Sequence, residues 1–442
     1  MRLDDDTLYF IPLGGCGEIG MNFNVYIYNR QALLVDCGVM FGEEDETLLC
    51  ADISALDDLV DRVIALVITH AHQDHIGAIP YLWPELECPV YGTQFAIEMM
   101  YLRLDEMGLS QRVPVRMMGL SETVAIGPFL VRRIPLTHST IEMGALHIQA
   151  GAATVLHTGD WTFDDDPILG PTSDLEALKA MGIDGVDALV GDSTNALKNG
   201  WTGAEGSLRE AFLRHLSAAE GRVVVTMFSS NVARLQLLSE LAQKTGRELL
   251  LLGRSLNQVV RAAKRSGYLV DFAQHVSPRE FGYIPPRKVL IICSGSQGSW
   301  NSTLVQLARD RKRDVYLESG DRVLFSARRI PGREQDITDL QDMLNARGIE
   351  VVDSNDDAIH VSGHPCQDEI RHMLKMVQPR VVIPVHGEGA HLEAHGQIAE
   401  AQDIRAVNIQ NGDVIAIKPA PNLSERVGCV HAGRRRIELT RG

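Results

Sequence analysis

The sequence lacks long hydrophobic runs, because no uncharged stretch approaches the roughly 18 residues that a membrane-spanning helix needs. Its seven cysteines are scattered and include no Cys-x-x-Cys pair, which argues against a zinc knuckle and a disulfide framework. The first twenty residues carry Asp4, Asp5 and Asp6 in place of a basic and then apolar signal pattern. These absences predict a globular cytoplasmic protein that does not associate with a membrane.

Positive charge is scarce in the chain as a whole, which carries a net charge of -16, but its distribution is uneven. Residues 1–200 contain 10 Lys and Arg against 30 Asp and Glu, whereas residues 201–345 contain 21 against 15. One internal segment is therefore basic within an acidic protein. The charge alone leaves two alternatives open, a solvated asymmetry and a surface for a polyanion.

The densest cluster of metal-ligand residue types lies in the segment 69–75, directly after the apolar run 63–68. His70, His72, Asp74 and His75 fall within six residues. Imidazole and carboxylate are the usual protein ligands of zinc and of neighbouring transition metals. This loop alone cannot complete a two-metal site, so further ligands must come from elsewhere in the chain.

Four further apolar runs end in residues of the same types, namely His138, Asp160, Asp192 and His386. Because the loops at the carboxyl ends of buried strands converge at one edge of a sheet, we expect these side chains to share one site. A single histidine or aspartate at such a position would be an ordinary structural residue, but the repetition favours a site. Asp36 ends another predicted strand, where it would orient a ligand histidine through a hydrogen bond.

Nine short segments then match, in order, the motifs of a known family. They are GGCGEIGMN at 14–22, THAHQDHIGAIPYL at 69–82, HTGDWTFD at 157–164, GDSTNA at 191–196, FSSN at 228–231, GRS at 253–255, SGSQG at 294–298, HVSGH at 360–364 and PVHGE at 384–388. The sequence thus resembles the metallo-β-lactamase fold with a β-CASP insertion, and most closely the ribonuclease J family.

The resemblance implies an α/β fold, an αββα metallo-β-lactamase sandwich with an inserted α/β β-CASP domain. The alternation of strands and helices between residues 201 and 345 independently predicts a parallel α/β subdomain. We expect the sandwich to comprise residues 1–200 and 351–420, the insertion to comprise 201–350, and residues 421–442 to form a short tail that is either a last strand or a mobile end.

The resemblance also implies two divalent metal ions, zinc with manganese as the alternative. One ion would be held by His70, His72, His138 and Asp160, and the other by Asp74, His75, Asp160 and His386. Two such ions about 3.5–4 Å apart share a hydroxide and clamp the attacking and leaving oxygens during displacement at phosphorus.

Asp192 and His364 resemble the carboxylate and histidine that assist the leaving oxygen in this family, and Asp74 is expected to serve catalysis as well. The predicted substrate-binding residues are His360, Val361, Ser362, Gly363 and His364, with Ser294 and Ser296 as weaker candidates. The segment 360–364 suits a phosphate cradle independently, because its small residues permit close backbone approach and residues 365–369 look like the first turn of a helix. The alternative for Ser294 and Ser296 is a plain strand-to-helix turn.

The implied function is hydrolysis of RNA phosphodiester bonds in RNA processing and decay, both as a 5′-exonuclease that prefers a 5′-monophosphate and as an endonuclease. RNA is the expected partner, and a homodimer or higher oligomer is expected. Basic residues of the insertion would neutralise the RNA backbone: Arg254, Arg261, Lys264, Arg265, Arg309, Arg311, Lys312 and Arg313.

Three alternatives remain open at this point. They are a β-CASP nuclease acting on DNA, a small-molecule metallo-hydrolase on the same scaffold, and an RNA-binding scaffold with a vestigial site. The chain departs from the family pattern at residues 140–142, where Thr-Ile-Glu replaces the common Ile-Pro-Asp, so the surroundings of His138 are expected to differ.

Overall fold

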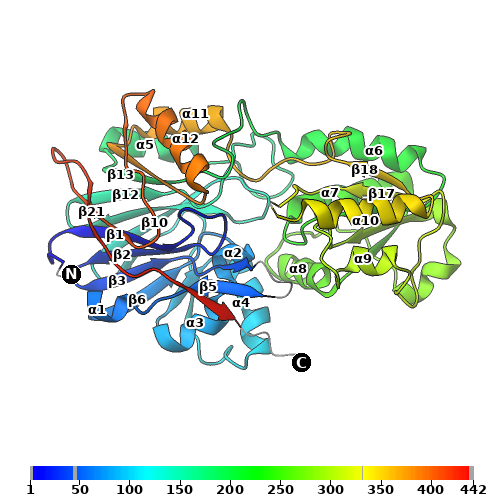
Figure 1. Ribbon diagram of the computed structural model, residues 1–442, viewed down its shortest axis with the longest axis horizontal. Coiled ribbons are helices and arrows are strands. Elements are labelled where there is room, and N and C mark those ends of the chain that lie inside the picture. Colours follow the sequence, from blue (N-terminus) through cyan, green and yellow to red (C-terminus); the bar gives the residue numbers. More distant parts are fainter. Residues whose placement is uncertain (1–2, 43–46, 331, 438–442) are drawn as a thin grey trace. The chain divides into compact units, whose positions relative to one another are not determined.

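The computed structural model describes residues 3–42, 47–330 and 332–437, and within it the chain forms two compact units (Figure 1). Unit 1 is built from three segments, which run up to Asp165, from Pro171 to Thr202, and from Gly363 onward. Unit 2 comprises Asp166–Gly170 and Gly203–Ser362.

Two mixed sheets and a small third sheet make up the strands of unit 1. The first sheet has the order β22 (Glu425–Cys429), β21 (Asp413–Ile417), β1 (Leu8–Gly14), β2 (Phe23–Tyr28), β3 (Gln31–Val35), β6 (Arg62–Val67), β7 (Val90–Gly92) and β8 (Val115–Met117). The second has the order β20 (Arg405–Ala406), β19 (Val381–Val385), β13 (Ala188–Asp192), β12 (Ala153–His157), β11 (Gly144–Ala150), β10 (Phe129–Pro135) and β9 (Thr123–Ile126). The third contains β23 (Arg434–Ile437), β5 (Leu48–Ala51) and β4 (Val39–Phe41).

Helices cover the outer faces of the two large sheets, as Figure 1 shows. Beside the first sheet lie α1 (Leu56–Leu59), α2 (Gln73–Ile76), α3 (Ile79–Leu86) and α4 (Gln94–Glu106), and against the second lie α5 (Leu175–Asp184), α11 (Gln367–Val377) and α12 (Gly389–Glu400). Alternation along β12 separates the two cores, because Val155 packs between the sheets whereas Leu156 packs against the helices. The predicted αββα sandwich is therefore confirmed.

Parallel pairing in unit 1 aligns the strand ends that carry the predicted site residues. In the first sheet β3 pairs with β6, and Val35 lies opposite Val67. In the second sheet β13 pairs in parallel with β12 and with β19, where Asp192 lies opposite Val385. The residues that follow these strands consequently emerge at the same ends of their sheets.

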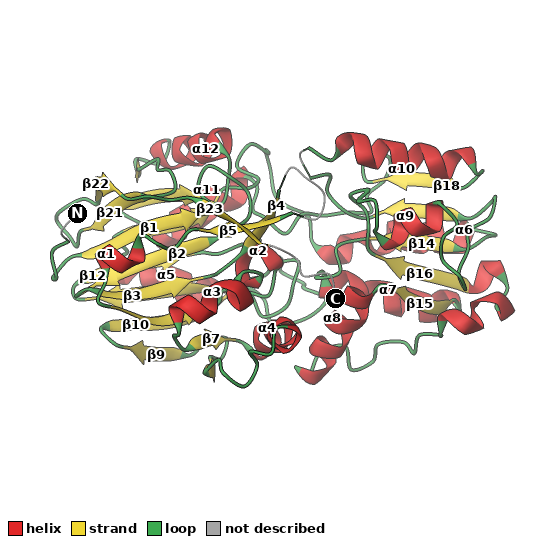
Figure 2. Cartoon of the chain, turned by 60° about the horizontal axis from the view of Figure 1, so that its bottom comes forward, coloured by secondary structure: helices red, strands yellow, loops and turns green. Residues whose placement is uncertain are grey.

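Unit 2 contains one parallel sheet with helices on its faces, shown in Figure 2. The strand order is β15 (Glu248–Leu252), β16 (Val289–Cys293), β14 (Val223–Thr226), β17 (Arg322–Phe325) and β18 (Glu350–Asp353). The helical elements are η1 (Glu205–Leu208), α6 (Arg209–Ala218), α7 (Val232–Thr245), α8 (Arg254–Arg265), η2 (Pro278–Tyr283), η3 (Pro286–Lys288), α9 (Thr303–Ala308) and α10 (Glu334–Ala346). The predicted parallel α/β subdomain is confirmed, although β14 is shorter than the predicted strand over 222–228.

In its described part, the segment after residue 420 forms the strands β22 and β23. Of the two predictions for the tail, a last strand or a mobile end, the structure therefore agrees with the strand. β22 extends the first sheet beside β21, and β23 pairs with β5. Arg435 Nη1 donates to the Glu85 carboxylate at 2.7 Å, and Arg434 pairs with Glu18. Among the described residues, no helix combines the length and the apolarity needed to cross a membrane.

Candidate metal centre

The ligand loop follows β6 and passes directly into α2. Thr69 and His70 are buried, and His72 is the N-cap of α2, so that Asp74 and His75 lie in its first turn. The loop approaches the end of β3 closely, since a Cβ on Gly38 would lie 1.6 Å from the carbonyl oxygen of Asp74. Only glycine fits at position 38, and this permits the close approach.

Asp36 anchors the loop from the end of β3. Its carboxylate accepts hydrogen bonds from the Thr69 backbone N–H at 2.8 Å, from Thr69 Oγ1 at 2.8 Å and from His75 Nδ1 at 2.7 Å. The predicted contact between Asp36 and a candidate ligand histidine is therefore present. Because His75 Nδ1 donates to Asp36, Nε2 is the nitrogen that would bind a metal once it has released its proton.

The first candidate ligand group consists of His70, His72, His138 and Asp160, whose ligand atoms all lie within 4.8 Å of one another. His138 Nδ1 donates to the Gly363 carbonyl at 2.6 Å, and His138 Nε2 lies 3.1 Å from His72 Nδ1. His70 Nδ1 lies 3.0 Å from Thr69 Oγ1, whose own proton goes to Asp36. These contacts direct His70 Nε2 and His138 Nε2 toward the shared space.

The second candidate group consists of Asp74, His75, Asp160 and His386, within the same 4.8 Å limit. Asp160 joins the two groups, with Oδ2 3.2 Å from His75 Nε2 and Oδ1 3.0 Å from His386 Nδ1. His386 has a positive φ of 53°, and its N–H donates to the Gly15 carbonyl at 2.6 Å. A left-handed conformation at a non-glycine residue is strained, and here it holds the imidazole within the group.

The donor atoms of both groups fit divalent cations. Of the described side chains, His70 Nε2, His72 Nε2, both Asp160 carboxylate oxygens and both His386 ring nitrogens are buried without a hydrogen-bond partner. Leaving so many polar atoms unpaired in one place is costly, and a bound cation satisfies them together. Five imidazoles and two carboxylates also form the donor set that zinc prefers.

Electrostatics distinguish the two groups. Burial lowers the pKa of His70 and His138 well below the usual value and that of His72 to about 4. Burial acts in the same direction on His386, but the carboxylate of Asp160 outweighs it and raises the pKa of His386 to about 9. The carboxylates of Asp160, Asp74 and Asp36 likewise outweigh burial at His75 and raise its pKa well above the usual value. In the metal-free protein the histidines of the first group are therefore uncharged near pH 7, whereas His75 and His386 are protonated.

Asp192 and His364 form a hydrogen-bonded pair beside Asp160. Asp192 Oδ2 accepts from His364 Nδ1 at 2.8 Å, and His364 Nδ1 lies 3.9 Å from Asp160 Oδ2. Asp192 Oδ1 also accepts the Thr194 backbone N–H at 2.9 Å. Because Nδ1 donates to Asp192, proton exchange between this imidazole and a substrate would involve Nε2.

The predicted phosphate cradle belongs to two units. Gly363 and His364 lie in unit 1, whereas the preceding residues 360–362 lie in unit 2. Ser294 and Ser296 follow β16 of unit 2, and His360 follows β18, so all three lie beyond the carboxyl edge of the same sheet. The helix predicted from residue 365 begins two residues later, as α11 at Gln367.

Two residues that support the candidate ligands were not predicted as site residues from the sequence. Arg133 is fully buried on β10 and donates to the carbonyls of Ile68 at 2.5 Å and Thr69 at 2.8 Å, which braces the ligand loop. Asn22 Nδ2 lies 3.0 Å from His75 Nε2. A signal for Arg133 was present, since a charge at an inward position of an alternating apolar strand requires buried partners.

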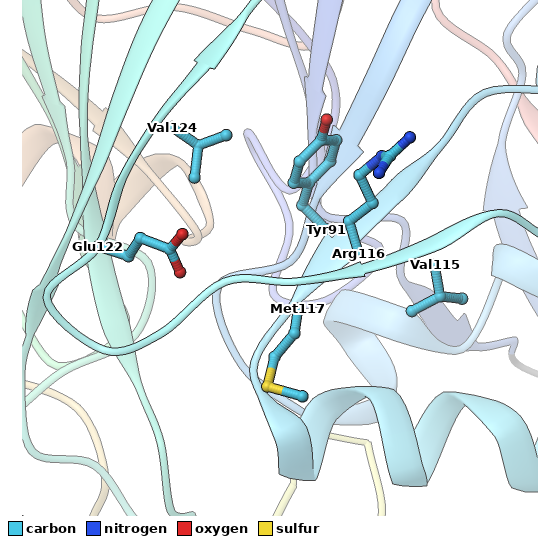
Figure 3. Close-up of a pocket in the computed structure, with 6 residues that line it drawn as sticks. All are labelled: Tyr91, Val115, Arg116, Met117, Glu122 and Val124. Carbon is cyan, nitrogen blue, oxygen red and sulfur yellow. The ribbon is translucent and has the colours of Figure 1, made fainter.

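Two surface pockets contain none of the predicted metal ligands or catalytic residues. One of about 600 Å³ lies in unit 1, where Figure 3 shows Glu122 and Val124 across from Tyr91 and Arg116. The other, about 490 Å³, lies on unit 2 and is lined by Arg261, Lys264 and Arg265, together with His275. Three of the basic residues that were predicted to contact RNA therefore line one pocket beside α8.

Comparisons with known families agree with this architecture. The model of the "Metallo-beta-lactamase superfamily" matches residues 22–226, "Ribonuclease J, beta-CASP domain" matches 220–344, and "Zn-dependent metallo-hydrolase RNA specificity domain" matches 348–408. The fold and the two ligand groups thus define a metallo-hydrolase of the metallo-β-lactamase superfamily that carries a β-CASP domain.

Comparison with individual relatives identifies one family within this class of metallo-hydrolases. The chain is 40% identical to ribonuclease J of Sinorhizobium meliloti over 425 residues, which cover 94% of this chain and 75% of that protein. It is 35% identical to ribonuclease J of Helicobacter pylori strain J99 over 435 residues, covering 97% of this chain and 63% of that protein. The chain belongs to the ribonuclease J family.

A solved structure shares the fold at low identity. A crystal structure of a protein of unknown function from Enterococcus faecalis V583 matches 93% of this chain and all of that chain with a TM-score of 0.60 and 14% identity. This likeness concerns the fold alone.

Proposed function

We propose that the protein is a ribonuclease that hydrolyses RNA phosphodiester bonds with the help of two divalent metal ions. The observation that carries this proposal is the pair of ligand groups joined at Asp160, beside the Asp192–His364 pair, in a chain of the ribonuclease J family. We assign the first ion to His70, His72, His138 and Asp160, and the second to Asp74, His75, Asp160 and His386. Zinc suits this nitrogen-rich donor set best, with manganese as the alternative.

When bound, the two cations supply an activated water and stabilise charge on the phosphate oxygens. The chain itself supplies the proton for the leaving 3′-oxygen, which His364 Nε2 donates as the bond from phosphorus to that oxygen breaks. Asp192 positions the imidazole through Nδ1 and stabilises its protonated form. Asp36 and Asp160 are themselves buried, whereas the side chains of Asp74 and His364 remain partly exposed, which leaves the site open to substrate.

We further propose that the enzyme acts as a 5′-exonuclease that prefers a 5′-monophosphate and also as an endonuclease. The segment 360–364 together with Ser294 and Ser296 would receive substrate phosphate. Residues 1–200 and 351–420 would form the catalytic domain, and 201–350 the RNA-binding insertion. A cytoplasmic location and a homodimeric or higher state complete the proposal; the seven free cysteines suit a reducing compartment.

Four single-stranded substrates test this function with the metal-loaded protein: RNA with a labelled 5′-monophosphate, RNA with a labelled 5′-triphosphate, and the two matching DNAs. We expect labelled mononucleotide only from the monophosphate RNA, and longer labelled fragments from internal cleavage of both RNAs. The variant Asp74→Ala, His75→Ala should lose both activities. Faster cleavage of DNA, or full activity in the variant, would refute the proposal, and sedimentation of the same sample measures the oligomeric state.

A further inference from the structure

An exposed tryptophan lies in the loop that precedes the boundary between the two units. Trp201 exposes 55% of its surface, whereas Trp83 and Trp161 expose 5% and 2%. The indole of Trp201 lies 5.7 Å from the His372 ring, centroid to centroid, at an interplanar angle of 54°. The His372 ring lies 5.7 Å from Phe163, and Phe163 lies 4.6 Å from the buried Trp161. A continuous series of rings therefore leads from the core of unit 1 to its surface.

One buried carboxylate fixes this series in place. Glu369 is fully buried on α11 and accepts the backbone N–H groups of Phe163 at 2.9 Å, Thr202 at 2.8 Å and Cys366 at 2.9 Å. These three donors come from three separate segments of unit 1. The backbone on both sides of the ring series is thus held by charge-assisted hydrogen bonds, so the outermost ring sits on a rigid support.

The same loop also holds the candidate proton donor. Thr202 Oγ1 donates to the His364 carbonyl at 2.7 Å, and Asn195 Nδ2 donates to the same oxygen at 3.0 Å. Beyond His364, the backbone N–H of Gln367 bonds to the Lys198 carbonyl at 2.9 Å. Trp201 is therefore one residue from a side chain that contacts His364, in a loop laid along the start of α11.

Packing does not account for this exposure. Trp161 at the inner end of the ring series is buried in the core, whereas leaving the indole of Trp201 largely in water forgoes the free energy of its burial. A rigid, exposed aromatic face is, however, the feature on which an unpaired base stacks, irrespective of its identity. We infer that Trp201 is a stacking platform for one unpaired nucleobase of the RNA strand that is cleaved beside His364. This inference rests on the proposed function and adds a base-binding position to it.

Stopped-flow fluorescence on the metal-loaded full chain tests the inference, because it separates binding from cleavage. The variants are Trp201→Ala and Trp201→Phe, and the matched control is Trp300→Phe, whose indole is 49% exposed in unit 2. Single-stranded oligoadenylate RNA should quench wild-type and Trp300→Phe fluorescence, but not that of Trp201→Phe. Affinity, measured for every variant by the fluorescence anisotropy of dye-labelled oligoadenylate, should fall about tenfold in Trp201→Ala and change little in Trp201→Phe, which keeps an aromatic face.

Two further readouts exclude a purely structural effect. An RNA series with a single abasic position moved along the strand should contain one member that binds wild type about tenfold more weakly, and Trp201→Ala should not distinguish that member. The salt dependence of binding should be the same in both proteins, since stacking releases no phosphate counterion.

Persistent quenching in Trp201→Phe, or an unchanged affinity in Trp201→Ala, would overturn the inference while leaving RNA cleavage by the wild type intact. Self-association that disappears in Trp201→Ala while RNA affinity is retained would assign the surface to a second copy of the chain and also overturn it. A wild type that binds RNA with Trp201-dependent quenching but cleaves none would sink the proposed function and support the stacking platform.

Discussion

His75 Nδ1 lies 2.7 Å from Asp36 Oδ2 and donates a hydrogen bond to it, so that α2 and the end of β3 are tied through the imidazole of a candidate ligand. The same carboxylate holds Thr69, and Thr69 in turn contacts His70. One buried aspartate therefore orients a histidine of each ligand group. Groups that orient ligands in this way set the geometry and basicity of the metal-binding nitrogens.

Replacing Asp36 by asparagine should weaken metal binding without unfolding the protein. Asparagine keeps the shape but loses the negative charge that strengthens the hydrogen bond accepted from His75 Nδ1. We expect affinity for zinc to fall about 10–100-fold, measured by competition with a chelator. Asp61→Asn is the matched control, because Asp61 makes an exposed ion pair with Arg30. Equal affinity in Asp36→Asn and wild type would contradict the role of Asp36.

Arg133→Met should destabilise the ligand loop from the opposite side. The substitution leaves two buried carbonyls, those of Ile68 and Thr69, without their donors, at a cost of about 1–3 kcal/mol each. A lower midpoint of thermal unfolding and a reduced metal content should appear together. Arg132→Met on the same strand should change neither, since Arg132 is only partly buried. If the Arg133 variant kept its full metal content, the guanidinium would serve stability alone.

Metal uptake at the two groups should differ in its coupling to protons. The pKa of His72 is lowered to about 4, so the first group binds metal near pH 7 without displacing a proton from it. The pKa of His386 is raised to about 9 and that of His75 is also raised well above its usual value, so the second group must release protons when it binds metal at pH 7. Calorimetry in buffers of different ionisation enthalpy should therefore give one ion with proton release and one with little. Release of equal numbers of protons by both ions would contradict the assignment.

The raised pKa of His386 also determines the direction in which the stability of the metal-free protein changes with pH. Because the pKa of His386 is raised in the folded state, its protonated form stabilises the fold below the ordinary histidine value near 6.5, and this contribution disappears as the pH rises through about 9. Denaturant unfolding of metal-free wild type should show this loss. His386→Gln should show a smaller loss, because the raised pKa of His75 contributes in the same direction, and a loss equal to that of wild type would contradict the role of His386.

Arg234 should control how the second unit presents His360. Its buried guanidinium donates to the Ser326 carbonyl at 2.8 Å, to His360 Nδ1 at 2.9 Å and to the Val361 carbonyl at 3.3 Å, and it pairs with the buried Glu205. Because Nδ1 accepts, His360 carries its proton on Nε2. Arg234→Lys removes the forked donor, and we expect KM for 5′-monophosphate RNA to rise more than KM for 5′-hydroxyl RNA.

The control for this variant is Arg209→Lys, whose guanidinium makes a half-exposed pair with Glu240. An equal rise of KM for the two RNAs in Arg234→Lys would mean that Arg234 acts through general stability. The comparison therefore separates a positioning effect on the segment 360–362 from loss of the fold.

The sequence was sufficient to predict which side chains form the two candidate ligand groups, because their types are distinctive and each follows a recognisable apolar strand. His386 lies more than three hundred residues after His70, and only the order of the family motifs linked the two in the sequence. In the structure, the parallel pairing of β19 with β13 brings His386 to the end of the sheet that carries Asp192. Arg133 was not predicted because the strand pattern marks a buried charge without identifying its partners, which are the carbonyls of Ile68 and Thr69. The segment 360–364 looked like one cradle, and its division after Ser362 depends on packing that spacing does not encode.

The pairing of β13 with β19 and of β1 with β21 has a consequence for synthesis on the ribosome. Both large sheets keep an open edge until residues that follow unit 2 in the chain have emerged, and open edges invite pairing with other chains. Both sheets of the amino-terminal segment therefore remain incomplete while unit 2 is translated. His386 follows unit 2 in the chain, so the second candidate ligand group stays incomplete until unit 2 and β19 have both been translated.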